Sequence, residues 1–439
     1  MMTYDEAGRY ISNVSKTGSI LGLDSIRALM AVLSNVQDAI PIIHIAGTNG
    51  KGSVGAYLAS ILKEEGLHVG RYCSPAVFDP LEVWQYDGKN MSQDEYASIM
   101  SQVKSACDIV VSQGGVHPTV FEVETAAAFL YFYQRKADVL LLETGMGGST
   151  DATNLIRRPM ASVITTISMD HMKFLGNTLS SIAQAKGGII KEACPVFSAP
   201  QQPEVEQVLR TIAGEKHTTI TFADSAFSDE GTGKLEIQRE IPGEMNFTYD
   251  GIAYTTSMAG HYQIYNAALA IEVYKGLPQL QRHAREEQTG ILQRGIRNAY
   301  WPGRFEVIGQ NPLFIVDGAH NEDAARQLKE TLENCFTNTA ITYIIGVLAD
   351  KEHEKMLQIM LPLAKRVYTV TPDNGRAMDG SRLAEEAMRY HTDVHACATV
   401  EEAVKLALQT KNTIVAFGSL SYLGDLKNAY WKLQNERWQ

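Results

Sequence analysis

The stretch between residues 41 and 62, "PIIHIAGTNGKGSVGAYLASIL", constrains the fold more than any other part of the chain. It begins with an apolar run that is typical of a buried strand. After the glycine-rich segment, apolar residues recur at i, i+3, i+4, i+7 and i+8, which predicts a helix with one apolar face. The chain is therefore expected to pass from a strand through a glycine loop into a helix at this point.

The composition of this loop suits an anion. Gly47, Gly50 and Gly52 let the backbone approach a ligand closely, and the following helix N-terminus offers N–H groups and a favourable dipole. Lys51 adds a mobile positive charge and Ser53 a hydroxyl suited to Mg²⁺. The spacing differs from GxxxxGK[ST], because the hydroxyl residue comes two positions after the lysine. A tight strand-to-helix turn is the alternative, but the lysine favours a nucleotide phosphate.

The rest of the chain predicts an α/β protein with two domains. "ADVLLLET" and "MASVITTIS" are typical of buried strands, and their alternation with helical patterns predicts a parallel sheet covered by helices. Short alternating runs between residues 218 and 254 predict a small antiparallel insertion. After "NAYWPGRFEVI" the alternation begins again. We therefore expect an N-terminal P-loop-type nucleotide-binding domain at 1–299 and a smaller Rossmann-like α/β domain at 300–439.

Composition excludes several classes of protein. The 439 residues carry a formal net charge of −11 without a Lys/Arg block, which argues against a general nucleic-acid binder. No apolar run approaches the ~20 residues of a membrane span, and the N-terminus lacks the apolar core of a signal peptide. Five scattered cysteines fit a reducing compartment. We expect a cytoplasmic monomer with neither nucleic acid nor membrane as a partner.

Two strand ends carry candidate metal ligands. Glu143 ends one buried strand, and Asp170 and His171 follow the next. Ligands of open α/β sheets bind at this edge, so a carboxylate and an imidazole here could hold Mg²⁺ beside a triphosphate. The alternatives are a helix cap or surface salt bridge for Glu143 and an ordinary hydrogen-bonded role for His171.

Several motifs together resemble one family. "GTNGKGS", the leader "YDEAGRYISNVSKTGSILGLDSIRALM" and "FGSLSYLG" near the C-terminus resemble the folylpolyglutamate synthase and dihydrofolate synthase family of the Mur ligase superfamily. The resemblance covers nearly the whole chain and implies an ATP-driven, amide-forming enzyme. It implies that ATP is bound by Gly47, Thr48, Asn49, Gly50, Lys51, Gly52 and Ser53.

The same resemblance implies a metal site and an unusual lysine. It assigns Mg²⁺ to Ser53, to Ser74 in "CSPAV", to Glu143 and to His171. It also implies that Lys186, in "AKGGIIK", is carbamylated and holds a second metal. Lys51, His171 and Lys186 are thereby candidate catalytic residues. The chain departs from the family pattern at Ser149, Thr150, Ala185 and Gly187. A solvated lysine at a helix end is the alternative for Lys186.

The second half of the chain supplies further candidates by resemblance. Asn266 would contact the nucleotide, and Arg304 in "WPGRFE" would reach its phosphates. Asp317 and His320 in "FIVDGAHN" would act where ATP meets the acceptor, with Asp317 also contacting the nucleotide. The alternatives are a helix cap for Asn266 and Asn321 and a turn residue for Asp317.

The predicted reaction is the ATP-dependent addition of L-glutamate to a folate through an acyl phosphate. We expect tetrahydrofolate as the acceptor, with dihydropteroate as a second one. In "SPAVFDPLEVWQYDGKNMS", Phe78 and Trp84 are expected to offer flat surfaces for a pterin ring. The alternatives are another Mur-type ligase such as a muramyl peptide synthetase, a simple phosphotransferase, or a nucleotide-binding protein without catalysis.

Overall fold

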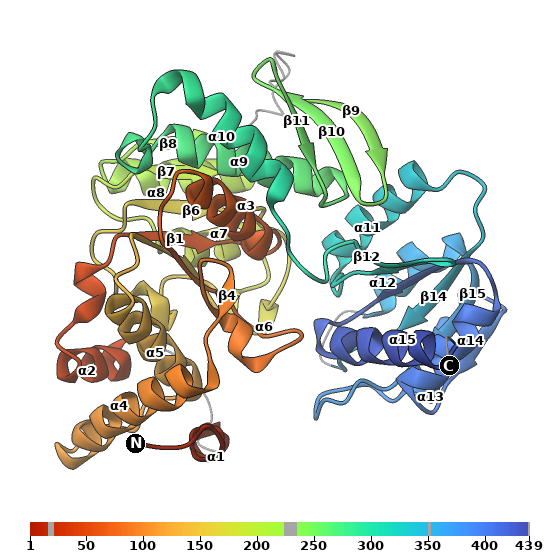
Figure 1. The fold of residues 1–439 in the computed structure, drawn as a ribbon, viewed down its shortest axis with the longest axis horizontal. Helices are drawn as coiled ribbons and strands as arrows, with labels where there is room; N and C mark the ends of the chain where they lie inside the picture. The colour runs from red at the N-terminus through yellow and green to blue at the C-terminus, as the bar shows by residue number, and fades with distance from the viewer. Residues whose placement is uncertain (16–21, 224–234, 350–352, 438–439) are drawn as a thin grey trace. The chain divides into compact units, whose positions relative to one another are not determined.

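The computed structural model describes residues 1–15, 22–223, 235–349 and 353–437, and its ribbon is drawn in Figure 1. Two compact units divide the chain: Met1–Leu235 with Tyr265–Ala299, and Glu236–Ile264 with Tyr300–Gln439. None of the helices in these described ranges combines the length and apolarity that a bilayer crossing requires. All five cysteines are free thiols.

Unit 1 is built on an eight-stranded sheet in the order β4-β3-β2-β5-β1-β6-β7-β8. The six strands from β2 to β8 in this order run parallel, which confirms the predicted parallel sheet, and β3 and β4 add an antiparallel hairpin at one edge. The strands are β1 (Ile42–Ala46), β2 (Val69–Tyr72), β3 (Trp84–Tyr86), β4 (Lys89–Asn90), β5 (Val139–Glu143), β6 (Ala161–Ile164), β7 (Val196–Ser198) and β8 (Ile220–Phe222).

Helices cover both faces of this sheet. All residues of β1 and β5 are buried, although alternate side chains point to opposite faces. One core cluster joins α1, α2, α4 and α5 to Ile42, Leu140 and Leu142, while α3 packs against β1, β2 and β5. The helices are α1 (Tyr4–Val14), α2 (Asp24–Val32), α3 (Lys51–Glu64), α4 (Gln93–Ser112), α5 (Val120–Gln134), α6 (Met172–Leu175), α7 (Leu179–Gly187), α8 (Pro203–Glu215), α9 (His261–Lys275) and α10 (Arg285–Asn298).

Unit 2 contains a second α/β sheet and a small antiparallel sheet. The six-stranded sheet has the order β12-β13-β17-β14-β15-β16, in which only the β12–β13 pair is antiparallel. Its strands are β12 (Glu306–Gln310), β13 (Leu313–Val316), β14 (Ile341–Ile345), β15 (Ala364–Thr369), β16 (Val394–Ala396) and β17 (Thr413–Phe417). Its helices are α11 (Glu322–Cys335), α12 (His353–Met360), α13 (Gly380–Ala387), α14 (Val400–Gln409) and α15 (Leu423–Arg437).

The small sheet consists of β9 (Leu235–Ile241), β10 (Glu244–Tyr249) and β11 (Ile252–Thr256). The antiparallel pairing of β10 with β11 confirms the period-two pattern read from the sequence. This sheet groups with unit 2 by contact, and α9 begins in unit 2 and continues in unit 1.

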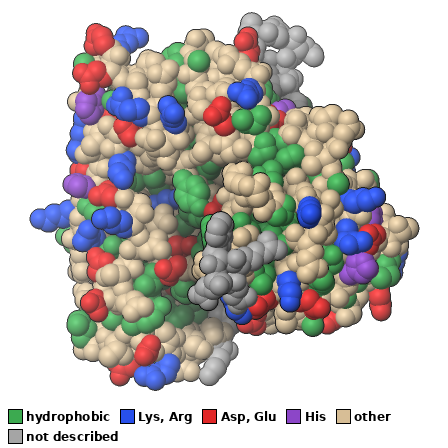
Figure 2. All heavy atoms as spheres, turned by 45° about the vertical axis from the view of Figure 1, so that its right-hand side comes forward, with side chains coloured by type: hydrophobic (Ala, Val, Ile, Leu, Met, Phe, Trp, Pro, Cys, Tyr) green, Lys and Arg blue, Asp and Glu red, His purple; other side chains and the backbone are tan. Residues whose placement is uncertain are grey.

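Charges of both signs are mixed on the surface. Figure 2 shows Lys and Arg side chains interspersed with Asp and Glu over the face that it displays. Many of the exposed pairs, such as Lys104 with Asp108 and Arg210 with Glu206, are one helical turn apart. Pairs of this kind contribute ~0.3–0.5 kcal/mol each to the free energy of unfolding, so the stability of the fold comes mainly from its hydrophobic cores.

The contact between α3 and α10 generates a test of core packing. A Cβ atom at Gly295 of α10 would lie 2.6 Å from the Cα of Ile61 in α3. Gly295→Ala must therefore separate the two helices and should lower the free energy of unfolding by ~1–3 kcal/mol. Gly290→Ala in the same helix is the control, because its Cβ would meet only the flexible end of Arg294 at 3.2 Å.

Gly290→Ala should leave stability unchanged or raise it by up to ~1 kcal/mol through helix propensity. Urea denaturation of both variants measures the difference. Equal stability of the two alanine variants would show that α3 and α10 do not pack as closely as described.

Candidate active site

The glycine loop occupies residues 47–50, between the end of β1 and the start of α3. The backbone N–H groups of Thr48 and Asn49 donate to the carbonyl of Thr166, at 2.8 and 3.3 Å. The Thr48 hydroxyl donates to the carbonyl of Ser168 at 3.0 Å and accepts from its N–H at 3.1 Å. The first half of the loop is thus fastened to the segment after β6, while no side chain caps α3. An uncapped helix N-terminus is suited to bind an anion.

Two positions of the loop require glycine, because neighbouring side chains leave no room for a Cβ atom. Gly47 has φ of 153°, and a Cβ there would overlap the Thr165 side chain. Gly50 has φ of 90°, and a Cβ there would collide with the side-chain amide of Asn266. Asn266, on α9, is only 3% exposed, so the structure places this predicted nucleotide contact directly against the loop.

Lys51 folds back over the loop that precedes it. Its Nζ donates to the carbonyls of Gly47 and Thr48, at 3.2 and 3.4 Å. It also lies 3.8 Å from Oε1 of Glu143, which ends β5 and is 9% exposed. The start of α3, which follows β1, and the end of the neighbouring strand β5 therefore bring the lysine and the candidate metal-binding carboxylate together.

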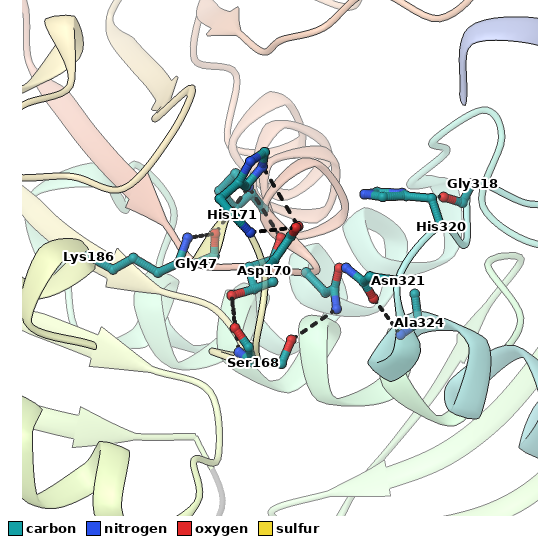
Figure 3. Close-up of polar contacts among 12 residues, drawn as sticks. Gly47, Ser168, Asp170, His171, Lys186, Gly318, His320, Asn321 and Ala324 are labelled. Atoms are coloured by element: carbon teal, nitrogen blue, oxygen red, sulfur yellow. Dashed lines mark hydrogen bonds and ion pairs between the residues drawn. The ribbon is translucent and has the colours of Figure 1, made fainter. Parts of the chain in front are cut away.

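Lys186 reaches the same carbonyl from α7. Its Nζ donates to Gly47 O at 2.7 Å (Figure 3), and the residue is 4% exposed. The alternative of a solvated lysine at a helix end is therefore wrong. Burial, aided by the nearby ammonium group of Lys51, lowers the pKa of Lys186 to about 7, although neighbouring carboxylates oppose the shift. A large fraction of the side chain is thus neutral at pH 7 and able to act as a nucleophile.

The side chain of His171 is more exposed to solvent than those of Lys51 and Lys186. Its side chain is 42% exposed, with Nε2 3.7 Å from Oδ2 of Asp170. Its backbone N–H donates to Oδ1 of the same carboxylate at 2.8 Å, as Figure 3 shows. The residue has φ of 51° and precedes α6. Asp170 therefore holds both the backbone and the imidazole of His171.

The predicted metal ligands have suitable chemistry but do not form a compact cluster. Across the described ranges, no three His, Cys, Asp or Glu side chains are grouped to hold a metal ion. Ser53 is buried, Ser74 is half-buried, and both offer hard oxygen donors like the Glu143 carboxylate. The Thr165 hydroxyl beside Gly47 is buried and has no hydrogen-bond partner among the described residues. This donor set fits a magnesium ion.

The sequence analysis did not identify Arg71, which supports the first turn of α3 directly after the glycine loop. This residue of β2 is 5% exposed, and its guanidinium donates to the carbonyl of Gly52 in the first turn of α3. Burial lowers its pKa, while Cys73, Glu143 and Glu82 raise it. A lone arginine inside the apolar run "HVGRYC" was the available signal, because a buried charge needs a specific partner.

In unit 2, Asp317 is held at the end of β13. It is 4% exposed and accepts hydrogen bonds from the N–H groups of Phe305 and Ala319, at 2.7 and 2.8 Å, and from the Tyr262 hydroxyl at 3.4 Å. Burial raises its pKa, opposed first by the nearby Arg304. Asp317 therefore fixes the backbone immediately after Arg304.

The remaining residues of this motif lie at the start of α11. The imidazole Nδ1 of His320 is 2.8 Å from the carbonyl of Gly318, and Asn321 accepts from the N–H of Ala324 at 2.9 Å (Figure 3). The alternative of a helix cap is therefore confirmed for Asn321. The missing side chain of Gly318 leaves room for the guanidinium of Arg304, which a Cβ there would strike.

The expectation that Trp84 offers a stacking surface is wrong. Trp84 is 2% exposed, and its ring packs between Tyr72 and Tyr96, with centroid separations of 6.4 and 5.5 Å. Its Nε1 donates to the carbonyl of Glu124 at 3.3 Å. Sequence alone could not distinguish an exposed aromatic ring from a core ring, while Phe78 is half-buried.

The contact between Gly50 and Asn266 gives a direct test of the loop. Gly50→Ala should weaken ATP binding, because the new Cβ displaces the Asn266 amide and the backbone conformation costs ~1–3 kcal/mol for a residue with a side chain. Gly66→Ala is the control, since Gly66 has φ of 76° with open space around its Cβ position. Calorimetric titration with ATP measures both, and equal ATP affinities would contradict this description of the loop.

Two family models and several curated proteins match this chain. The Mur ligase middle domain matches residues 45–274, and the Mur ligase glutamate ligase domain matches residues 303–420. The dihydrofolate synthase/folylpolyglutamate synthase of Bacillus subtilis is 33% identical, over 97% of this chain and 98% of its own length. The folylpolyglutamate synthase of Lacticaseibacillus casei is 32% identical, over 86% of this chain and 87% of its own.

Solved structures of this family have the same fold. Folylpolyglutamate synthase of Mycobacterium tuberculosis, complexed with ADP and AMPPCP, superimposes with a TM-score of 0.85 at 27% identity and covers 98% of both chains. A folylpolyglutamate synthase–AMPPCP–folate complex gives a TM-score of 0.81 at 28% identity, over 97% of this chain and 99% of the other. The chain therefore belongs to the dihydrofolate synthase/folylpolyglutamate synthase family of Mur ligases.

Proposed function

We propose that this chain is an ATP-dependent amide ligase that adds L-glutamate to a folate through an acyl phosphate. The observation that carries the proposal is the uncapped glycine loop, where Lys51 and Lys186 meet at the Gly47 carbonyl beside Glu143. Family membership over nearly the whole chain supports the same reaction. ATP is the phosphate donor, with residues 1–299 as the ATP-binding domain and 300–439 as the ligase domain.

The reaction proceeds in two balanced steps. A carboxylate oxygen of the folate attacks the γ-phosphorus of ATP, and ADP leaves, which produces an acyl phosphate. The amine of L-glutamate then attacks the acyl carbon, inorganic phosphate leaves, and the amine loses a proton. Amide formation from a carboxylate and an amine has an unfavourable free energy in water, and cleavage of the terminal phosphate bond of ATP drives it.

Residues of unit 1 hold the triphosphate. The loop from Gly47 to Ser53 binds the phosphates through its backbone, including Thr48, Asn49, Gly50 and Gly52. Lys51 exchanges its internal carbonyl partners for the γ-phosphate, where its positive charge stabilises charge that develops during transfer. Asn266 contacts the nucleotide from α9, since its amide already abuts Gly50.

Mg²⁺ would be held by Ser53, Ser74, Glu143 and His171, with Lys186 as a further ligand after carbamylation. When bound, the ion offsets the crowding of anionic oxygens on the triphosphate. Burial of Lys186 supports its carbamylation, because the reaction with CO₂ requires a neutral amine.

Three residues of unit 2 also have proposed roles in the reaction. Arg304 pairs with phosphate oxygens through its planar guanidinium. Asp317 positions Arg304 by holding the N–H of Phe305, and it contacts the nucleotide. His320 acts on the reacting groups through the ring nitrogen that does not face Gly318 O. The protein would act as a cytoplasmic monomer on small molecules, without nucleic acid or membrane partners.

One assay tests the proposed reaction. The purified protein should release ADP only when both tetrahydrofolate and L-glutamate are present, and mass spectrometry should show a folate that has gained one glutamate. Lys51→Ala should lower kcat by ~10²–10³-fold, because it removes a charge that acts in the transition state. Lys63→Ala, exposed at the other end of α3, is the control and should keep full activity.

Each other outcome of this assay is informative. ADP release without an amide product would identify a phosphotransferase, and a product formed only from dihydropteroate would replace the folate acceptor. Full activity of a folded Lys51→Ala protein would refute the role given to the loop.

The metal proposal has its own test. Glu143→Gln and Lys186→Ala each remove a proposed ligand, so each should raise the Mg²⁺ concentration for half-maximal activity by ~10-fold or more. Glu192→Gln, exposed shortly after α7, is the control. An unchanged Mg²⁺ requirement in both ligand variants would place the metal elsewhere.

A further inference from the structure

Glu65 is a buried carboxylate at the end of α3 that lies farther from the glycine loop. It is 1% exposed and caps the C-terminus of the helix that Lys51 begins. Its Oε1 accepts a hydrogen bond from the hydroxyl of Tyr274, near the end of α9. Its Oε2 accepts from the N–H of Arg282 at 2.8 Å and lies 2.8 Å from Nδ1 of His283. The fold therefore compensates this buried charge with groups from α9 and from the segment between α9 and α10.

These hydrogen bonds keep Glu65 ionised. Burial raises its pKa, but the hydrogen bonds from Tyr274, His283 and Arg282 outweigh burial, so the pKa lies below the ordinary value of 4.5. Burial and the contact with Glu65 raise the pKa of Tyr274, so the phenol remains the donor. The hydrogen bond between α3 and α9 is therefore charge-assisted near neutral pH, and such bonds are about twice as strong as neutral ones.

The two helices α3 and α9 meet at both ends of this arrangement. Beside the loop, the side-chain amide of Asn266 occupies the space that a Cβ of Gly50 would need. At the other end, Tyr274 donates to Glu65. Asn266 and Tyr274 are ~12 Å apart along α9, because an α-helix rises ~1.5 Å per residue. A helix held at two such points cannot pivot, so the contact at Glu65 affects how Asn266 lies against the loop.

The helix α10 is fastened to α3 by other residues. Gly295 packs against the backbone of Ile61. The Arg294 guanidinium and the Asn298 amide donate to the Glu64 carboxylate, at 2.8 and 3.2 Å. Loss of the hydrogen bond from α9 therefore leaves the packing of α10 on α3 in place.

We propose that Glu65 is a positioning residue of the nucleotide site, which holds Asn266 against the glycine loop by fastening the end of α9 to the end of α3. This inference rests on the proposed function, in which Asn266 contacts the nucleotide. Glu65 lies ~20 Å along α3 from the loop, so it acts through α9 and not by touching the substrate. A small displacement of α9 is enough, because a binding group must lie within ~0.5 Å of its productive position.

The test removes one hydroxyl group. Tyr274→Phe keeps the ring and leaves Glu65 its other donors, whereas Glu65→Ala would leave all of them without an acceptor. Tyr274→Phe should weaken ATP binding by ~3- to 30-fold in calorimetric titration. Binding of inorganic tripolyphosphate, which requires only the loop, should not change. Tyr86→Phe is the matched control and should change neither, since its hydroxyl donates to the carbonyl of Arg135 at 3.1 Å, at the hairpin edge of the sheet.

A double variant separates positioning from general stability. Asn266→Ala removes the group that is positioned, so adding Tyr274→Phe should reduce ATP affinity no further. A loss by the same factor with and without the Asn266 amide would show that the Tyr274 hydroxyl serves stability alone, and would overturn the inference. In the ligase assay, Tyr274→Phe should raise KM for ATP by the factor seen in the titration and leave kcat unchanged.

The outcomes separate this inference from the proposed function. A natural protein that binds ATP but forms no amide product would refute the ligase, and the titrations would still decide the role of Glu65. Unchanged ATP affinity in a folded Tyr274→Phe protein, or an equal loss of tripolyphosphate affinity, would overturn the inference and leave the ligase intact. A natural protein that does not bind ATP would refute both.

Discussion

The carbonyl of Gly47 accepts hydrogen bonds from the Nζ atoms of two lysines, and the rest of the candidate site is arranged around this contact. Lys51 comes from the helix that the loop starts, whereas Lys186 comes from α7, 139 residues after Gly47. Two lysine side chains at one oxygen repel each other when both are charged, and nearby negative charge offsets this repulsion. Glu143 supplies it at the end of the adjacent strand, 3.8 Å from Lys51. The parallel sheet is what brings these groups to one edge.

Buried aspartates of this chain accept several hydrogen bonds each. Asp151 and Asp317 are each surrounded by donors, including the N–H groups of Met146 and Thr153 for the first and of Phe305 and Ala319 for the second. They hold the backbone around the candidate site in place.

Much of the fold follows from local patterns. The continuous apolar runs of β1 and β5 predict strands buried on both faces, and all their residues are buried. The alternating pattern of β10 and β11 likewise predicts their antiparallel pairing. The glycine loop could also be located, because only glycine tolerates the φ of 90° at Gly50 beside a neighbouring side chain. Trp84 shows the limit, since a strand residue's exposure depends on which helices cover it.

The sequence by itself determined the order of strands and helices, the loop and the identities of the candidate residues, because periodicity and residue type are local properties. Only the tertiary structure decided that Lys186 is buried against Gly47 and that Arg71 supports the first turn of α3. Each of these depends on segments that are distant in the chain. Their burial and partners, and hence their pKa values, are set by packing between elements.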